Sequence, residues 1–322
     1  MVAVLVAGCA TGEPAAPSVV AESSAAPTSS IPEPAEVRAN ELGEVPVLMY
    51  HRVVPKPTSV YDRDPEQFRA ELRRLATEGY VPVTVADFAA GKIDIPAGAH
   101  PVVLTFDDGD RSQSALGANG EPAPDTAVGI LQQVAKEHPG FRPVASLYVN
   151  ADPFGGASMA WLRDHGFEIG NHTRTHANLA QLDGAGVQQE IAQEHRAIDQ
   201  AVPGYRVSTL ALPFGVAPED PKLALRGMSG GTAYDYRCVL LVGAEPSPSP
   251  FAATFDPLNV PRIRSQGLTG EDARYGSTTR LDELAASPQR RYTSDGVADR
   301  ISYPRSSGVA PGDRFAGQAV GY

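Results

Sequence analysis

The chain has 322 residues, of which 42% are hydrophobic, and its formal net charge at pH 7 is −11. This hydrophobic fraction can fill a sizeable core, so the composition excludes a wholly disordered chain. The acidic balance argues against a nucleic-acid partner, because phosphate binding requires clustered Lys and Arg. There are only two cysteines, Cys9 and Cys238, so a disulfide scaffold is not expected.

A short apolar segment, residues 1–9, ends at Cys9 and is too short to span a bilayer. Its last residues, Val6-Ala7-Gly8-Cys9, resemble the lipobox of bacterial lipoproteins, in which the signal is cleaved before a cysteine that then carries lipid. No basic n-region precedes this segment. The resemblance implies a lipoprotein signal at 1–9, lipidation of Cys9, and a chain that is secreted or held at the extracellular face of the membrane.

Residues 10–39 are rich in Ala, Pro, Ser and Glu and have no periodic apolar pattern. This composition predicts a disordered tether. Together with a lipid on Cys9, the tether would hold the following domain near a membrane surface.

From residue 45 onward, apolar runs alternate with helical patterns. Asp64 followed by Pro65 predicts a helix start, and Phe68, Leu72 and Leu75 then recur at helical spacing. The alternation predicts an α/β fold with a largely parallel sheet, either open or closed into a barrel. The predicted strands cover 45–50, 102–106, 144–149, 167–169, 207–212 and 237–242, and the predicted helices cover 65–78, 126–137, 159–163 and 184–198.

Beyond about residue 266 the chain is rich in Gly, Ser, Arg and Thr and has no apolar periodicity. We therefore predict a single folded domain at 40–268 and a low-order C-terminal tail at 269–322.

Polar side chains that suit chemistry follow four of the predicted strands. These residues are His51, Asp107 with Asp108, His172, and the segment Pro213-Phe214-Gly215. In parallel sheets, active sites gather at the carboxyl ends of the strands. The four positions are therefore expected to meet at one edge of the sheet.

Asp108, His172 and His176 have the residue types of a catalytic metal site, which usually takes three protein ligands and leaves a position for water. His172 and His176 are four residues apart and would face the same way on a helical turn. Asp107 would then act as general base toward a water acidified by the metal. Alone, an Asp-Asp-Gly sequence is more often a turn, and a His-x3-His sequence is more often a solvated helix face. Their ordered placement after two strands favours the metal site.

Two of these segments carry a family resemblance. Thr105-Phe106-Asp107-Asp108-Gly109 and His172-Thr173-Arg174-Thr175-His176 resemble the first two motifs of the polysaccharide deacetylases, carbohydrate esterase family 4, also called the NodB-homology domain. The resemblance spans about 45–264 and implies a distorted (β/α) barrel with fewer than eight units. It also implies that Asp107 is the catalytic base, and that Asp108, His172 and His176 bind a divalent metal, most often Zn²⁺. Carboxylate and imidazole ligands accept Co²⁺ or Ni²⁺ as well.

The chain departs from the family pattern at Ala211, where the third motif usually has an Arg that orients the catalytic Asp. This departure puts full activity in doubt. The segment Pro261-Arg262-Ile263 resembles a recurrent segment of the extracellular biofilm-polysaccharide N-deacetylase branch, so Arg262 is predicted to support Asp107 instead. We also group Arg262 with Pro213, Phe214 and Gly215 as candidate substrate-binding residues, with Phe214 forming a groove wall for a sugar ring.

The family's last motif contributes a C-terminal His as general acid, but all seven His of this chain lie at or before His195. The segment from Val45 to His51 resembles the N-terminal signature of the biofilm-polysaccharide branch, in which an early His replaces that acid. The resemblance implies that His51 protonates the departing amine. The alternative is a His that is simply hydrogen-bonded at a strand end.

The sequence thus predicts a metal-dependent hydrolase that removes N-acetyl groups from an extracellular or cell-wall polysaccharide. One alternative keeps the site but acts on O-acetyl esters or on peptidoglycan. Another is a carbohydrate-binding lipoprotein that keeps the fold and is catalytically impaired. We expect a monomer that contacts the membrane only through lipid on Cys9.

Overall fold

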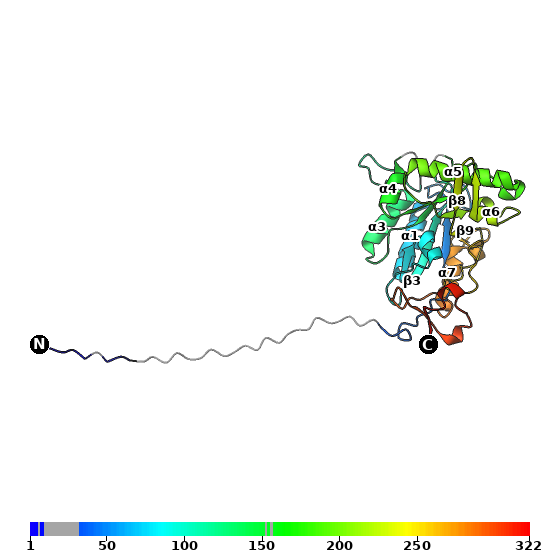
Figure 1. Cartoon of the computed structure of the whole chain (residues 1–322). Helices are drawn as coiled ribbons and strands as arrows, with labels where there is room; N and C mark the ends of the chain where they lie inside the picture. The colour runs from blue at the N-terminus through cyan, green and yellow to red at the C-terminus, as the bar shows by residue number, and fades with distance from the viewer. Residues whose placement is uncertain (6, 10–31, 152, 155–156) are drawn as a thin grey trace. The chain divides into compact units, whose positions relative to one another are not determined.

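A parallel sheet that curls back on itself forms the centre of the fold (Figure 1). The computed structural model describes residues 1–5, 7–9, 32–151, 153–154 and 157–322. The strand order is β10-β1-β3-β4-β5-β6-β9, with β2 paired to β3, and all of these pairs are parallel. The strands are β1 (Val47–Tyr50), β2 (Tyr80–Val83), β3 (His100–Phe106), β4 (Ser146–Val149), β5 (Glu168–Asn171), β6 (Thr209–Ala211), β9 (Cys238–Leu240) and β10 (Ile263–Arg264).

The two ends of this strand order are joined to each other. Single parallel bridges connect Leu240 with Val260 and Gly243 with Ile263, so the segment that leads into β10 also pairs with the end of β9. The sheet therefore closes on itself, and the predicted α/β fold with a distorted barrel is confirmed.

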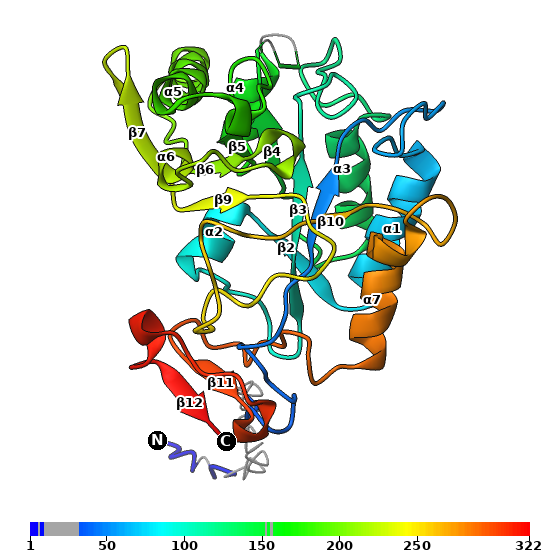
Figure 2. The same cartoon turned by 90° about the vertical axis from the view of Figure 1, so that its right-hand side faces the viewer.

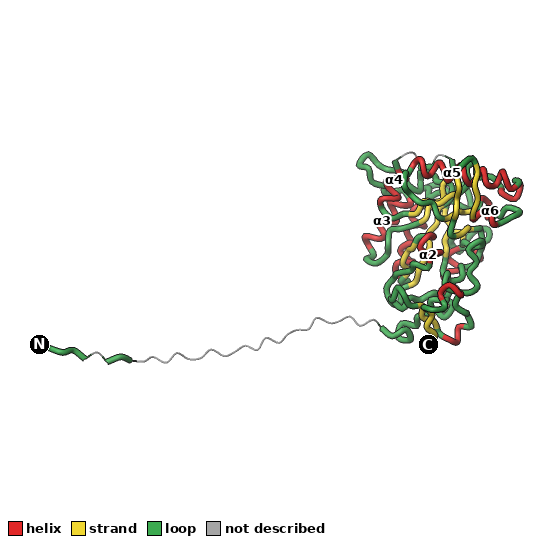
Figure 3. Tube along the Cα trace, in the orientation of Figure 1, coloured by secondary structure: helices red, strands yellow, loops and turns green. Residues whose placement is uncertain are grey.

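Helices lie outside the strands (Figures 1 and 3). The caps predicted for two of them are present: the carboxylate of Asp64 accepts from the backbone N–H of Glu66 and Gln67, and Asp183 accepts from Gly186. Phe68, Leu72 and Leu75 are buried, as their spacing predicted. The helices are α1 (Pro65–Thr77), α2 (Val85–Ala90), α3 (Ala127–Glu137), α4 (Ser158–Asp164), α5 (Gly184–Ala201), α6 (Lys222–Leu225) and α7 (Ser277–Ala286).

Several short elements were not predicted from the sequence. They are β2, α2 and an antiparallel hairpin of β7 (Arg226–Ser229) and β8 (Thr232–Asp235), which packs on α5. The hairpin turns at Gly230-Gly231, where both residues have positive φ. Its strands alternate between exposed and half-buried residues, so they lack the apolar run that marks the barrel strands.

The prediction of a low-order tail at 269–322 is wrong. This region contains α7 and a parallel pair of strands, β11 (Ile301–Tyr303) and β12 (Ala319–Gly321). Leu281, Leu284 and Tyr292 are buried. The buried apolar residues stand far apart in the sequence, so the region shows no periodicity even though it is folded.

The C-terminal region encloses a buried carboxylate, that of Glu41. This group accepts from the backbone N–H of Ser302 at 2.7 Å and from the hydroxyl of Tyr292 at 3.2 Å. Burial raises the pKa of Glu41 from 4.5 to about 7. Nearby, His100 at the start of β3 contacts the carbonyl oxygen of Tyr292. The region thus packs at the amino ends of the barrel strands (Figure 2).

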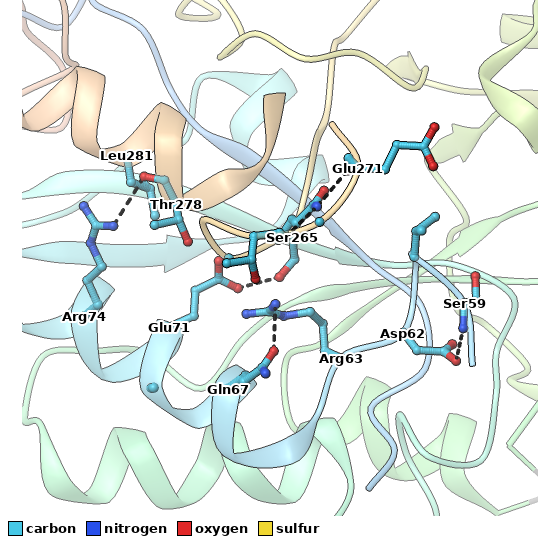
Figure 4. Close-up of a pocket in the computed structure, with 16 residues that line it drawn as sticks. Ser59, Asp62, Arg63, Gln67, Glu71, Arg74, Ser265, Glu271, Thr278 and Leu281 are labelled. Carbon is cyan, nitrogen blue, oxygen red and sulfur yellow. Dashed lines mark hydrogen bonds between the residues drawn. The ribbon is translucent and has the colours of Figure 1, made fainter. Parts of the chain in front are cut away.

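A cavity of about 490 Å³ lies between α1, α7 and the segment after β10 (Figure 4). On its wall, the buried carboxylate of Glu71 accepts from the hydroxyls of Tyr50 at 2.8 Å and Ser265 at 2.6 Å, and also from Ser277. These bonds tie α1 and α7 to the barrel. Because they occupy the carboxylate, they give Glu71 a structural role.

The predicted tether at 10–39 falls on residues outside the described part of the chain as far as residue 31. From residue 32 the chain is described, and it forms a turn at 34–38 that is followed by the buried Ala39. The folded unit therefore begins before residue 40. Cys9 is an exposed free thiol and Cys238 a buried one. Within the described residues, no helix is long and apolar enough to cross a membrane.

Candidate active site

The ends of three parallel strands bring together the polar residues predicted from the sequence. Asp107 and Asp108 follow β3, His172 follows β5, and His51 follows β1. Oδ1 of Asp108 lies 3.5 Å from Nε2 of His172 and 3.6 Å from Nε2 of His176. Donor atoms of these three residues all lie within 4.8 Å of one another.

These distances fit a metal. Ligand atoms at roughly 2.0–2.1 Å from a tetrahedral zinc stand roughly 3.3–3.5 Å apart, close to the separations around Asp108 Oδ1. Two imidazoles and a carboxylate are also a donor set that zinc accepts. The residues present therefore fit a divalent cation.

Hydrogen bonding orients the first of the two imidazoles. Nδ1 of His172 lies 2.8 Å from the carbonyl oxygen of Ala211, and a carbonyl can only accept. The ring must therefore carry its proton on Nδ1, which leaves the lone pair of Nε2 directed toward Asp108. Burial lowers the pKa of His172, which also favours the neutral, metal-binding form. On the other side, Asn150 donates to Oδ1 of Asp108 at 3.2 Å.

The two histidines do not lie on a helical turn, as the spacing had suggested. They stand in a loop after β5, in which Thr173 has φ 66° and His176 has φ 56°. This turn brings the two rings to 4.9 Å between centroids. Asp108 also has positive φ, at 77°. Such conformations are uncommon for residues with a side chain and concentrate at functional sites.

Asp107 is held by an arginine from a distant part of the chain. Nη1 and Nη2 of Arg262 donate to the two carboxylate oxygens of Asp107 at 2.6 and 2.8 Å, and both side chains are buried. Burial alone would raise the pKa of Asp107, but the charges of Arg262 and His172 outweigh it and hold this pKa below its usual range. Asp107 is therefore ionised at neutral pH.

The predicted contact between Arg262 and Asp107 is thus present. Grouping Arg262 with the substrate-binding residues was wrong, because its side chain is fully buried and offers no surface to a sugar. Pro213 is buried as well, which removes it from the same group.

Phe214 stands at the rim of the site. Its side chain is 60% exposed, and its ring lies 4.7 Å from the ring of His176. The turn that presents it has positive φ at both Phe214 and Gly215. A Cβ on Gly215 would lie 2.5 Å from the backbone nitrogen of Val242, so only glycine fits there.

His51 is half-buried, and its ring lies 4.9 Å from the ring of Tyr61. Its charge contributes to the low pKa of Asp107, which places the two groups near each other. Nδ1 of His51 has no hydrogen-bond partner in the described part of the chain. This argues against the alternative in which a hydrogen bond simply fixes the ring at a strand end.

Sequence reasoning missed three residues that position the site. Gln113 is buried and donates to the backbone carbonyls of Asp107 at 2.5 Å and His51 at 3.1 Å. Asn150 and the carbonyl of Ala211 contact the metal-site residues, as described above. A lone Gln or Asn carries no pattern, and a backbone carbonyl has no sequence signal at all.

Comparison with known proteins agrees with this site. Residues 94–228 match the family model described as polysaccharide deacetylase. Among solved structures, the chain is similar to the Bacillus anthracis protein BA0330, with 22% identity and a TM-score of 0.54, covering 69% of this chain and 64% of that one. The chain thus spans less than two thirds of the length of BA0330.

Two further structures have a similar fold. The Streptococcus pyogenes deacetylase PplD, solved in complex with acetate, is 18% identical with a TM-score of 0.53, covering 69% of this chain and 92% of that one. IcaB from Ammonifex degensii is 18% identical with a TM-score of 0.51, covering 76% and 97%. At these identities the likeness shows a shared fold, that of a deacetylase barrel. Taken with the family model, it places this chain in the polysaccharide deacetylase family.

Proposed function

We propose that this protein is a metal-dependent N-deacetylase of an extracellular or cell-wall polysaccharide. It would hydrolyse the carbon–nitrogen bond of an acetamido group and release acetate and an amino sugar. The observation that carries the proposal is the cluster of Asp108, His172 and His176 next to an ionised Asp107 that Arg262 holds.

Asp108, His172 and His176 are the residues that would hold the cation. A divalent ion bound there supplies Lewis acidity for the carbonyl and lowers the pKa of water to about 7. We propose Zn²⁺ as the ion, and Co²⁺ or Ni²⁺ also suit these ligands. The tautomer of His172, fixed through Ala211, leaves Nε2 ready to bind.

Asp107 accepts the proton of the attacking water. Its Oδ2 lies 3.9 Å from Nε2 of His172, so the carboxylate stands beside the metal-binding atoms. Arg262 keeps Asp107 ionised and holds both of its oxygens in a fixed plane. A carboxylate with a low pKa is a weak base, so the proton transfer depends on a water that is itself acidified.

His51 then donates a proton to the amine. In this step the water oxygen forms a bond to the acetyl carbon, the carbon–nitrogen bond breaks, and the nitrogen leaves with the proton from His51. The half-buried ring has Nδ1 free of protein partners in the described residues, so hydrogen bonding does not fix its tautomer.

Acetate release tests the proposal. The full chain, supplied with ZnCl₂, is assayed on oligomers of N-acetylglucosamine, on peptidoglycan and on acetyl xylan. We expect release from N-acetylated sugars, a loss of release on chelation, and recovery when zinc is restored. The Asp107→Asn variant should bind zinc and release little acetate.

Other outcomes select the alternatives. Release from acetyl xylan alone would identify an O-acetyl esterase, and release from peptidoglycan alone a peptidoglycan deacetylase. Saccharide binding without bound metal or acetate release would identify a carbohydrate-binding protein.

We also propose that Cys9 carries lipid and anchors the domain outside the cell. The exposed thiol of Cys9 and the lipobox-like sequence before it support this location. Cys9→Ser should move the expressed protein from the membrane fraction to the soluble fraction. An unchanged distribution would rule out a lipid anchor at this position.

A further inference from the structure

A second concave feature lies beside the candidate active site, at the ends of β1, β9 and β10. It is a cavity of about 300 Å³, within the lower range of ligand sites. Apart from Met49, the residues that line it come from two loops and from the segment after β9. They are Tyr61, Val242, Gly243, Ala244, Arg264, Asp272 and Tyr275. All of them fall outside the residues that match the family model.

Two contacts make this cavity continuous with the site. On one side, the ring of Tyr61 lies 4.9 Å from the ring of His51. On the other side, Val242 packs on Gly215, in the turn that presents Phe214. An extended ligand that lies between Phe214 and His51 therefore has the cavity as its next contact.

The lining of the cavity suits a sugar ring. Tyr61 and Tyr275 are 41% and 40% exposed, so each presents part of an aromatic face to solvent. Burial of such apolar surface by a ligand is favourable, and a pyranose offers C–H groups to cover it. The guanidinium of Arg264 lies 5.6 Å from the ring of Tyr61 and joins the two loops.

The polar groups of the cavity are of both signs. Nε and Nη2 of Arg264 donate to Oε1 of Gln266 at 3.2 and 2.6 Å, which fixes the guanidinium and leaves Nη1 without a partner in the described residues. The carboxylate of Asp272 also faces the cavity. A donor and an acceptor next to aromatic rings favour a neutral, hydroxyl-bearing ligand over a strongly charged one.

We propose that Tyr61, Arg264, Asp272 and Tyr275 form a subsite for the sugar next to the one that is deacetylated. This inference rests on the proposed function and extends it to the length of the substrate. The enzyme would act on residues within a chain and discriminate against single N-acetylated sugars. Binding energy from this neighbouring ring would then be available to the reaction at the acetyl group.

The dependence of rate on substrate length tests the subsite. The zinc-loaded full chain is assayed for acetate release on N-acetylglucosamine oligomers of increasing length. Each value of kcat/KM is divided by that for 4-nitrophenyl acetate, which is too small to fill the cavity. For the wild type, we expect this ratio to rise about tenfold or more between the monomer and the pentamer.

The variants Tyr275→Ala and Tyr61→Ala should each remove most of this rise. Tyr275 is the sharper choice, because Tyr61 also contacts His51. The matched control is Tyr322→Ala, whose side chain is also 40% exposed but lies with the C-terminal strands at the other end of the barrel. The control should keep the full rise. A wild type without a rise, or a Tyr275→Ala variant that keeps it, would overturn the subsite.

Failure of the proposed function would look different. If the wild type releases no acetate from any oligomer, the deacetylase proposal fails. The subsite is then judged by calorimetric binding of the pentamer to Asp107→Asn with and without Tyr275→Ala. Binding that weakens about tenfold in the double variant supports the subsite. Equal binding, or no binding by either protein, rejects it.

Discussion

Arg262 reaches Asp107 from a different strand than the family motif would use. Position 211 on β6 has Ala in place of the motif Arg, and the guanidinium comes instead from the residue before β10. The position of Asp107 could be predicted, because its motif is local in sequence. The Arg262 contact joins residues 155 positions apart, so only the resemblance to a branch of the family pointed to it.

Replacing Arg262 tests its role at Asp107. Arg262→Met leaves a buried carboxylate unpaired, which costs on the order of 3–5 kcal/mol of folding stability. We expect kcat to fall about 100-fold or more, and Arg262→Lys to recover only part of it, because lysine cannot form two parallel hydrogen bonds. Denaturant unfolding and acetate release measure the two effects. If Arg262→Met folds with an unchanged kcat, Arg262 does not position the base.

The metal cluster makes its own prediction. His172→Ala and Asp108→Ala should reduce bound zinc from one ion per chain to well below one, measured by elemental analysis after dialysis. Each loses one of three ligands, which is expected to weaken affinity by about 100-fold or more. His138→Ala, at the end of α3 and outside the cluster, is the matched control. If both ligand variants retain a full complement of zinc, the cation binds elsewhere.

The elements around the site show where sequence patterns stop working. Strand ends could be predicted because apolar runs mark the strands and parallel order places their carboxyl ends together. The loop after β5 could not, since the positive φ of Thr173 and His176 leaves no trace in residue type. What holds the loop is α5: Glu190 accepts from the backbone N–H of Thr175 at 2.9 Å and from its hydroxyl at 3.0 Å.

Glu190 should therefore affect metal binding without touching the metal. In Glu190→Ala, the loop loses both bonds to α5, and we expect zinc affinity to fall about tenfold. Competition with a chelator of known affinity gives the measurement. Gln189→Ala, an exposed neighbour on the same helix, is the control. Equal affinities in the two variants would mean that α5 does not hold the loop.

On the scale of the whole molecule, the C-terminal region completes the barrel at the end away from the site. The sequence gave no sign of this, because Tyr292 and Ile301 stand alone among polar residues. The region is held by contacts to a segment some 250 positions earlier, such as the bond from Tyr292 to Glu41. Contacts of this kind have no local pattern.

Glu41 makes folding stability depend on pH. Its pKa is about 7 in the folded chain and 4.5 for an unperturbed glutamate. A raised carboxyl pKa stabilises the fold most fully below pH 4.5, and this contribution is lost as pH rises through 7. The loss amounts to roughly 3 kcal/mol.

Glu41→Gln should remove this part of the pH dependence. Relative to wild type, the variant should be more stable at pH 8 than at pH 5, as measured by denaturant unfolding at both values. Constant effects of the new amide cancel in this comparison, and so does the raised pKa of Glu194, since both proteins contain it. Glu44→Gln is the control. A difference that does not change with pH would contradict the prediction.

The ends of the folded unit nearly meet. The hydroxyl of Tyr322 donates to the carbonyl oxygen of Ala39 at 2.8 Å, while the pairing of β10 with both β1 and β9 makes the barrel a continuous ring. A ring has no intrinsic first strand. The chain could therefore be joined from Tyr322 to Ala39 and reopened at the Gly230-Gly231 turn, which would leave Arg262, Asp107 and the metal cluster in the same neighbourhood. Circular order, rather than linear order, is what assembles this site.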